Sequence, residues 1–216
     1  FGQTNETGSF EFGGLNRDYI IHLPPGFDGS QSLPMVFNLH GLTSNALEQQ
    51  AYSGMDEIAD AENFIVCYAN GINNSWNVTP LSGSTVDDVG FLNELIDTLH
   101  ANYNIDLNRV YSCGMSNGGY MSYKLACELT DRITAIASVT GSMIPGTTAT
   151  CSPTRPIPVM QIHGTADDVV AYNGSFISVP IEDVLDLWLG FNDCIIGPDT
   201  IAVPDIDPDD ATTAQR

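Results

Sequence analysis

The segment that most constrains the fold of this chain is residues 114–118, with the sequence Gly-Met-Ser-Asn-Gly. An apolar, strand-like run precedes it at 109–113, and a helix-like run follows at 119–129. A Gly-x-Ser-x-Gly pentapeptide between a strand and a helix is typical of a sharp turn that exposes a nucleophilic serine. Glycines flank the serine because so tight a turn leaves no space for side chains there. We therefore predict that Ser116 is a nucleophile and that the backbone N–H of Asn117 faces the oxyanion.

A second donor for that oxyanion is expected from another strand end. Residues 33–39 form a buried-strand signal that ends in His40-Gly41. In folds with this kind of serine turn, the loop after the third strand supplies the second backbone N–H. The backbone N–H of Leu42, just past the glycine, is our candidate.

The acid that would orient a catalytic base is predicted after a later strand. The apolar run at 157–162 leads into His163-Gly164 and then Thr-Ala-Asp-Asp-Val-Val at 165–170. An acid that orients a histidine must sit on the short loop at the strand end. We predict Asp167 for this role, with Asp168 as the competing residue.

No histidine occupies the expected place in the chain. The order for such a serine hydrolase is serine, then acid, then histidine, whereas all four histidines precede Asp167: His22, His40, His100 and His163. His40 and His163 lie near the predicted site, but each precedes a glycine at a strand end, which favours a structural role. The sequence therefore predicts that the base lies beyond Arg216 and that the chain is only part of a catalytic domain.

Length and charge limit the classes of protein to which this chain can belong. The 216 residues suffice for one well-cored domain, although an eight-stranded sheet usually needs more. Acidic residues outnumber Lys and Arg by 27 to 6, for a net charge of −21. This balance argues against binding to nucleic acid or to an anionic membrane. No apolar run approaches the ~20 residues of a membrane span, and no signal peptide opens the chain. We expect a secreted protein, with a merely soluble acidic surface as the alternative.

The five cysteines suggest one disulfide and an unmatched thiol. Cys67 and Cys113 end strands on opposite sides of the 33–40 strand, so they would lie roughly 9–10 Å apart, too far to bridge. Cys127 and Cys151 are the plausible pair, and Cys194 would need a partner outside the chain. Because no Cys-x-x-Cys spacing is present, a zinc site is not expected.

The remaining pattern alternates strands and helices, which predicts a parallel α/β sheet in one domain. The expected elements are an opening hairpin at 9–23, a helix at 45–62, a strand at 64–69, a Gly/Asn/Ser-rich loop at 70–85, a helix at 86–103, a strand at 133–139 and a helix at 181–191.

These residues carry a resemblance to a known family. The block Gly-Met-Ser-Asn-Gly-Gly-Tyr-Met at 114–121, Leu-Ala-Cys-Glu at 125–128 and His-Gly-Thr-Ala-Asp-Asp-Val-Val at 163–170 resemble the polyhydroxybutyrate depolymerase/feruloyl esterase family of secreted α/β-hydrolases. The resemblance implies a mostly parallel twisted sheet with helices on both faces. It also implies that Trp76 lines the substrate pocket, that Ser116 and Asp167 are catalytic, and that no cofactor is needed.

The family's histidine lies in a Gly-His-x-Trp-Pro-like segment near the C-terminus, and this sequence has no such segment. The resemblance therefore implies a single α/β-hydrolase catalytic domain over 1–216, incomplete at the C-terminus. A C-terminal fragment of the same protein would carry the base.

The expected function is a serine esterase that cleaves carboxylic esters, of feruloyl or polyester type, through an acyl-enzyme. Its substrate would be an ester, on a plant-wall or polyester polymer. A peptidase, a lactone hydrolase and a non-catalytic binding module with a degenerate triad stay open, because fold does not fix function. Trp76 could stack on an aromatic acyl group or plug the core.

One acidic run resembles the start of a calcium loop. Asp205, Asp207 and Asp209 alternate, but Asp210 replaces the glycine at position six and Arg216 the glutamate at position twelve. A solvated acidic loop is the preferred interpretation.

Overall fold

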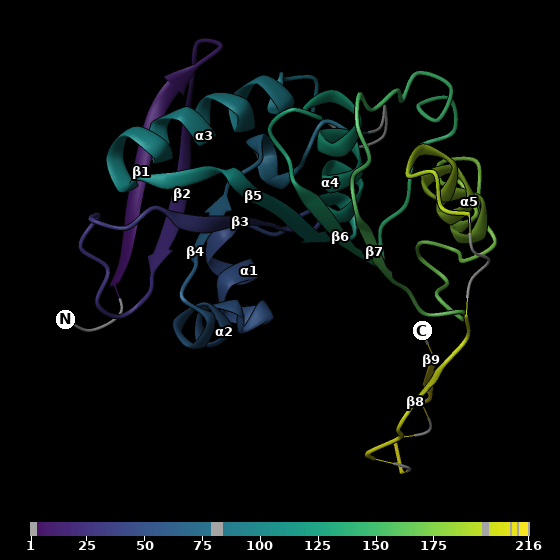
Figure 1. The fold of residues 1–216 in the computed structure, drawn as a ribbon. Helices are drawn as coiled ribbons and strands as arrows, with labels where there is room; N and C mark the ends of the chain where they lie inside the picture. Colours follow the sequence, from purple (N-terminus) through teal and green to yellow (C-terminus); the bar gives the residue numbers. More distant parts are fainter. Residues whose placement is uncertain (1–3, 79–83, 196–198, 208, 211, 216) are drawn as a thin grey trace.

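A computed structural model describes residues 4–78, 84–195, 199–207, 209–210 and 212–215 (Figure 1). Part of the predicted 70–85 loop and Arg216 lie outside the described residues. In this part of the chain, one sheet has the strand order β1-β2-β4-β3-β5-β6-β7. Its strands are β1 (Thr4–Phe12), β2 (Leu15–Leu23), β3 (Leu33–Leu39), β4 (Ile65–Ala69), β5 (Ile105–Met115), β6 (Ala135–Val139) and β7 (Val159–Ile162).

The strand pairing confirms the predicted parallel α/β sheet. β1 and β2 form an antiparallel hairpin that continues antiparallel onto β4. From β4 to β7 all neighbouring strands are parallel. The carboxyl ends of β3, β5, β6 and β7 therefore meet at one edge of the sheet, where ligand sites of such sheets form.

Helices cover both faces of the sheet (Figure 1). Two long helices lie on one face and a pair of short helices lies on the other, near β4. The helices are α1 (Ala46–Ser53), α2 (Met55–Glu62), α3 (Asp88–Tyr103), α4 (Asn117–Glu128) and α5 (Ile181–Phe191), with a 3₁₀ turn η1 (Ile72–Asn74).

The single helix predicted over 45–62 is wrong, because the structure has two helices there. Gly54 adopts a left-handed conformation, with φ 61° and ψ 17°, and ends α1. A residue in this conformation closes a helix, and glycine adopts it without steric cost. Other expected elements are confirmed within a few residues, and the bounds of α5 match the prediction.

The cysteines are arranged as predicted. Cys127, on α4, forms a disulfide with Cys151 in the loop before β7. Cys67 and Cys113 are free and lie on β4 and β5, with β3 between them. Cys194 is free and exposed.

The acidic run lies on an exposed hairpin. β8 (Ala202–Val203) pairs antiparallel with β9 (Ala214–Gln215), and Asp205, Asp207 and Asp209 between them are exposed. Among the described residues, no group of three or more His, Cys, Asp or Glu is arranged to hold a metal ion. None of the described helices is both long and apolar enough to cross a membrane.

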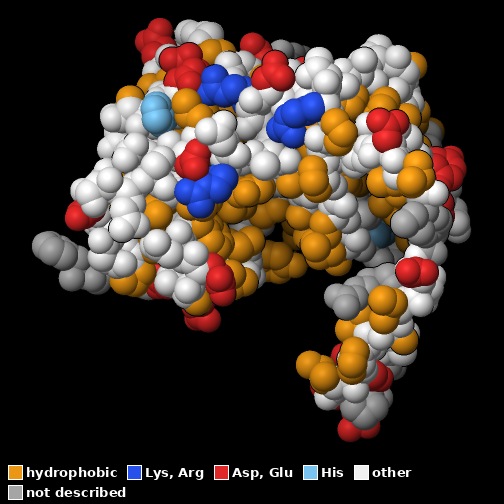
Figure 2. Space-filling model, viewed as in Figure 1, with side chains coloured by type: hydrophobic (Ala, Val, Ile, Leu, Met, Phe, Trp, Pro, Cys, Tyr) orange, Lys and Arg blue, Asp and Glu red, His pale blue; other side chains and the backbone are white. Residues whose placement is uncertain are grey.

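Part of one sheet face forms an apolar hollow of about 430 Å³. Side chains from β3, β5, β6 and β7 line it, among them Val36, Cys113 and Met160. Figure 2 shows hydrophobic side chains gathered in this hollow. On β7, Met160 and Ile162 are more than half exposed, so this part of the sheet is open in the described chain.

Candidate active site

Ser116 lies in a strained turn between β5 and α4. Its φ of 51° and ψ of −116° fall in a region that residues with side chains rarely occupy. The turn is held in place because the Ser116 N–H donates to the Val139 carbonyl at 2.8 Å, while the Ser116 carbonyl accepts from the Tyr120 N–H at 3.0 Å. Residue 116 as a whole is only partly buried, and it follows directly on the carboxyl end of β5.

The two flanking glycines are required by close backbone contacts, as predicted. A Cβ on Gly114 would lie 2.6 Å from the Gly118 carbonyl oxygen. A Cβ on Gly118 would lie 2.1 Å from the carbonyl oxygen of Leu39, at the end of β3. Since both contacts are to backbone, neither can be relieved by turning a side chain.

The two segments proposed to donate to the oxyanion lie against Ser116. Asn117 is the first residue of α4, and the first N–H groups of a helix have no partner within it. From the other side, a Cβ on Gly41 would lie 3.7 Å from the Ser116 Cβ. Leu42 follows directly and is half exposed. The structure thus brings Leu42 and Asn117 to the same place as the serine.

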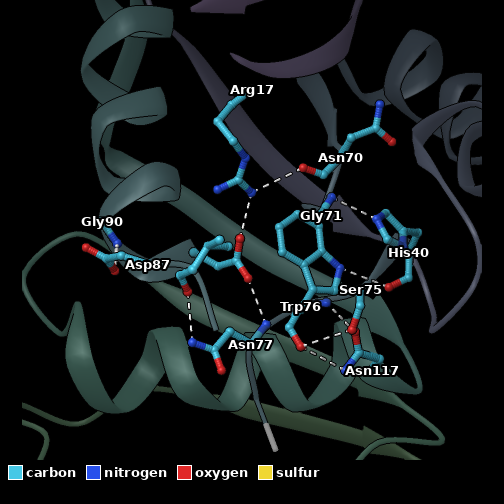
Figure 3. A network of polar contacts seen from close by, with 12 residues as sticks. Arg17, His40, Asn70, Gly71, Ser75, Trp76, Asn77, Asp87, Gly90 and Asn117 are labelled. Carbon is cyan, nitrogen blue, oxygen red and sulfur yellow. Dashed lines mark hydrogen bonds and ion pairs between the residues drawn. The ribbon is translucent and has the colours of Figure 1, made fainter. Parts of the chain in front are cut away.

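In the part of the chain that the structure describes, Trp76 is buried, which argues against the expected substrate contact. The indole is completely buried, with 0% of its surface exposed, and lies against His40 with ring centroids 5.0 Å apart. Its Nε1 donates to the His40 carbonyl at 3.0 Å (Figure 3). The indole is therefore part of the core, the second of the two roles that the sequence left open.

Asp167 is fixed by its own loop. Its Oδ1 accepts from the backbone N–H groups of Val169 and Val170, both at 2.9 Å. Its Oδ2 lies 3.5 Å from His163 Nε2. Burial raises the pKa of Tyr120, and the nearby negative charge of Asp167 adds to the rise. Asp167 is partly buried, whereas Asp168 is exposed.

Both ring nitrogens of His40 already form hydrogen bonds. Its Nδ1 lies 2.7 Å from the Gly41 carbonyl and must donate to it, while its Nε2 accepts from the Gly71 N–H at 3.0 Å. Burial lowers the pKa of His40, which favours this neutral ring. With both nitrogens engaged, His40 has no free position for a serine proton.

The other histidines are engaged as well. His163 Nε2 lies 2.7 Å from the Val170 carbonyl and must donate to it, which leaves Nδ1 to accept from Gln161 at 3.0 Å. His22 contacts Asn5 and Asp60, and His100 contacts the Ile105 carbonyl. Among the described residues, then, no histidine joins Ser116 to Asp167.

The sequence interpretation missed the buried pair of Arg17 and Asp88. Arg17 Nη2 lies 2.6 Å from Asp88 Oδ1, and both side chains are almost fully buried. The sequence feature that could have indicated the burial of Arg17 is the alternation of inward and outward residues in β2, where Arg17, Tyr19 and Ile21 share the buried face. Alternation predicts which side chains point inward, but it cannot name the partner.

Comparisons with the sequences of known proteins find matches over most of the chain. A family model described as "Putative esterase" matches residues 13–181. "Putative esterase NocK" of Nocardia uniformis subsp. tsuyamanensis is 34% identical over 166 residues, which cover 74% of this chain and 48% of that protein. "Feruloyl esterase B" of Piromyces equi is 32% identical over 171 residues, which cover 76% of this chain and 31% of that protein. The chain thus spans half or less of these relatives.

Solved structures share the fold. A ferulic acid esterase from Anaeromyces mucronatus in complex with ferulic acid superposes with a TM-score of 0.64 at 18% identity, over 88% of this chain and 80% of that one. A thermostable esterase gives a TM-score of 0.71 at 18% identity, over 87% and 52% of the two chains. At such identities the likeness establishes the fold, and it supports the predicted α/β-hydrolase architecture.

Proposed function

This chain belongs to the esterase family whose model spans residues 13–181, and from that membership we propose that it hydrolyses carboxylic esters through an acyl-enzyme on Ser116. The observation that carries the proposal is the strained turn, which places the serine between the first residue of α4, Asn117, and the Gly41–Leu42 segment. A strained backbone that the surrounding structure holds in place is characteristic of functional sites.

In the proposed mechanism, Ser116 attacks the ester carbonyl. The N–H groups of Leu42 and Asn117 hold the oxyanion of the tetrahedral intermediate, and loss of one such donor typically costs about 10²–10³ in rate. The base takes the Ser116 proton during the attack and gives it to the alcohol as the intermediate collapses. Water, deprotonated by the same base, then attacks the acyl-enzyme, and the carboxylic acid leaves as the proton returns to Ser116. Asp167 would orient the base through Oδ2, since its Oδ1 is occupied by two backbone N–H groups.

We propose that the base is a histidine outside residues 1–216, carried by a C-terminal fragment of the same protein. The support is that all four histidines of this sequence are engaged elsewhere. The segment that brings the base has a place to dock, because edge strands offer unpaired backbone groups and β7 borders the apolar hollow. Residues 1–216 alone should then turn over esters far more slowly than the enzyme with its base.

Feruloyl esters are the substrates we favour over polyesters, since similar relatives are named feruloyl esterases. Secretion, with a plant-wall polymer as substrate, is part of the same proposal. It is supported by the disulfide, because disulfides persist in oxidising compartments, and by the net charge of −21.

The test is covalent labelling combined with a substrate panel. Phenylmethylsulfonyl fluoride should modify Ser116 in active protein, and mass spectrometry of the peptides would locate the adduct. Methyl ferulate should be hydrolysed faster than a peptide or a lactone. Full esterase activity in a Ser116→Ala variant would refute the role of the serine, and preference for peptides would refute the substrate class.

A further inference from the structure

Trp76 forms hydrogen bonds to both segments that carry the proposed oxyanion donors (Figure 3). Its Nε1 donates to the carbonyl of His40, two residues before Leu42. Its backbone N–H donates to Asn117 Oδ1 at 2.7 Å, and its carbonyl accepts from Asn117 Nδ2 at 3.3 Å. One residue thus links the end of β3 to the start of α4, which are far apart along the chain.

Further contacts tie the segment before Trp76 to the His40 loop. The Gly71 N–H donates to His40 Nε2 at 3.0 Å. The Thr43 N–H donates to the Asn74 carbonyl at 2.8 Å. With the bond from Trp76 Nε1 to the His40 carbonyl, residues 70–77, which we call the brace, contact residues 40–43 through Gly71, Asn74 and Trp76.

The buried ion pair fixes both ends of the brace. Arg17 Nη2 donates to the Asn70 carbonyl at 3.2 Å, while Asp88 Oδ2 accepts from the Asn77 N–H at 2.7 Å. Arg17 also lies over the Phe91 ring, 3.8 Å from its centroid. Arg17 lies on β2 and Asp88 is the first residue of α3. The sheet and α3 therefore each hold one end of the brace.

We propose that Trp76 is a positioning residue that sets the separation of the two oxyanion donors. The inference rests on the proposed function, which assigns the N–H groups of Leu42 and Asn117 to the oxyanion. Such donors act only when they lie about 2.7–3.1 Å from the oxygen, and no covalent bond links the two segments near the site. β3 and β5 pair directly at Leu39 and Gly114. Beyond these strand ends, the indole and the backbone of Trp76 add a hydrogen-bonded link between the His40 carbonyl and the Asn117 side chain.

The test is Trp76→Phe in the complete, active enzyme. The change keeps a buried aromatic ring, removes the Nε1–H bond to the His40 carbonyl and also loses the packing of the larger indole, a loss that the control below matches. We expect kcat to fall about tenfold with KM nearly unchanged, less than the 10²–10³ for loss of a donor. The affinity for an aryl trifluoromethyl ketone, which forms a tetrahedral oxyanion on the serine, should fall by a similar factor. Binding of ferulate, which forms no such oxyanion, should not change.

Trp188→Phe is the matched control. Trp188 is also buried, and its Nε1 has no hydrogen-bond partner among the described residues. This variant should keep wild-type kcat and ketone affinity, although it loses similar packing.

The outcomes separate the two proposals. A wild-type enzyme that neither hydrolyses esters nor reacts with the sulfonyl fluoride refutes the proposed function. An active wild type with equal kcat in Trp76→Phe and Trp188→Phe refutes the positioning role. If Trp76→Phe does not fold, Asn117→Ala decides by the same measurements, since it removes both side-chain bonds to the Trp76 backbone, keeps the Asn117 backbone N–H and adds no charge beside the oxyanion; it should lower kcat and ketone affinity together.

Discussion

Replacing Gly118 by alanine tests the packing that holds the serine turn. The new Cβ would lie 2.1 Å from the Leu39 carbonyl oxygen, about 1.3 Å short of the 3.4 Å at which ordinary contact begins. Leu39 ends a central strand, so its backbone has little freedom to move. Insertion of a methyl group into a packed site costs about 1–3 kcal/mol. For a domain of this size that corresponds to a fall in Tm of roughly 2–12 °C.

Gly190→Ala is the control, because it makes the same chemical change in a helix with no steric cost. A Cβ on Gly190 would have no neighbour within 4 Å, and the residue lies exposed on α5. Alanine favours a helix over glycine by up to about 1 kcal/mol. Gly190→Ala should therefore raise Tm by up to roughly 4 °C.

Thermal and urea unfolding, followed by circular dichroism, would measure both variants against the wild type. Sulfonyl fluoride labelling of Ser116 should also slow in Gly118→Ala, since the Leu39 carbonyl and the Gly41–Leu42 segment would be displaced. A Gly118→Ala protein as stable as Gly190→Ala would refute the close contact, and with it the reason given for glycine in the turn.

Two further predictions concern the acid and the disulfide. Asp167→Asn should keep the fold yet lower ester turnover by orders of magnitude, because the base would lose its orienting partner. Asp168→Asn, at an exposed position, should have little effect. Steady-state kinetics on methyl ferulate compare the two variants, and the opposite ranking would show that Asp167 is not the acid. Replacing Cys127 and Cys151 together by serine opens a loop of sequence separation 24, which predicts a loss of about 3.4 kcal/mol in the free energy of unfolding. Urea unfolding measures that loss, and a value below about 1 kcal/mol would show that the cross-link restrains the unfolded chain little.

The sequence alone determined the features that depend on neighbouring residues. The turn at 114–118 could be predicted because strand, glycine spacing and helix are all local patterns. The loop of Asp167 and helix α5 could be predicted from the sequence for the same reason. The disulfide between Cys127 and Cys151 followed from placing strands and helices in order, because the parallel topology leaves few cysteines within bonding distance.

Tertiary structure decided the features that depend on pairs far apart in the chain. Arg17 and Asp88 are separated by 71 residues, and no local pattern states that they meet. The burial of Trp76 depends on His40 and Asn117, 36 and 41 residues away. The sequence favoured a structural role for His40 and His163 from their places at strand ends, but it could not name the hydrogen bonds that engage both nitrogens of each ring, because these form only in the folded chain. Periodicity and turn sterics fix the direction in which a side chain points, whereas its partner depends on how the whole sheet brings distant segments together.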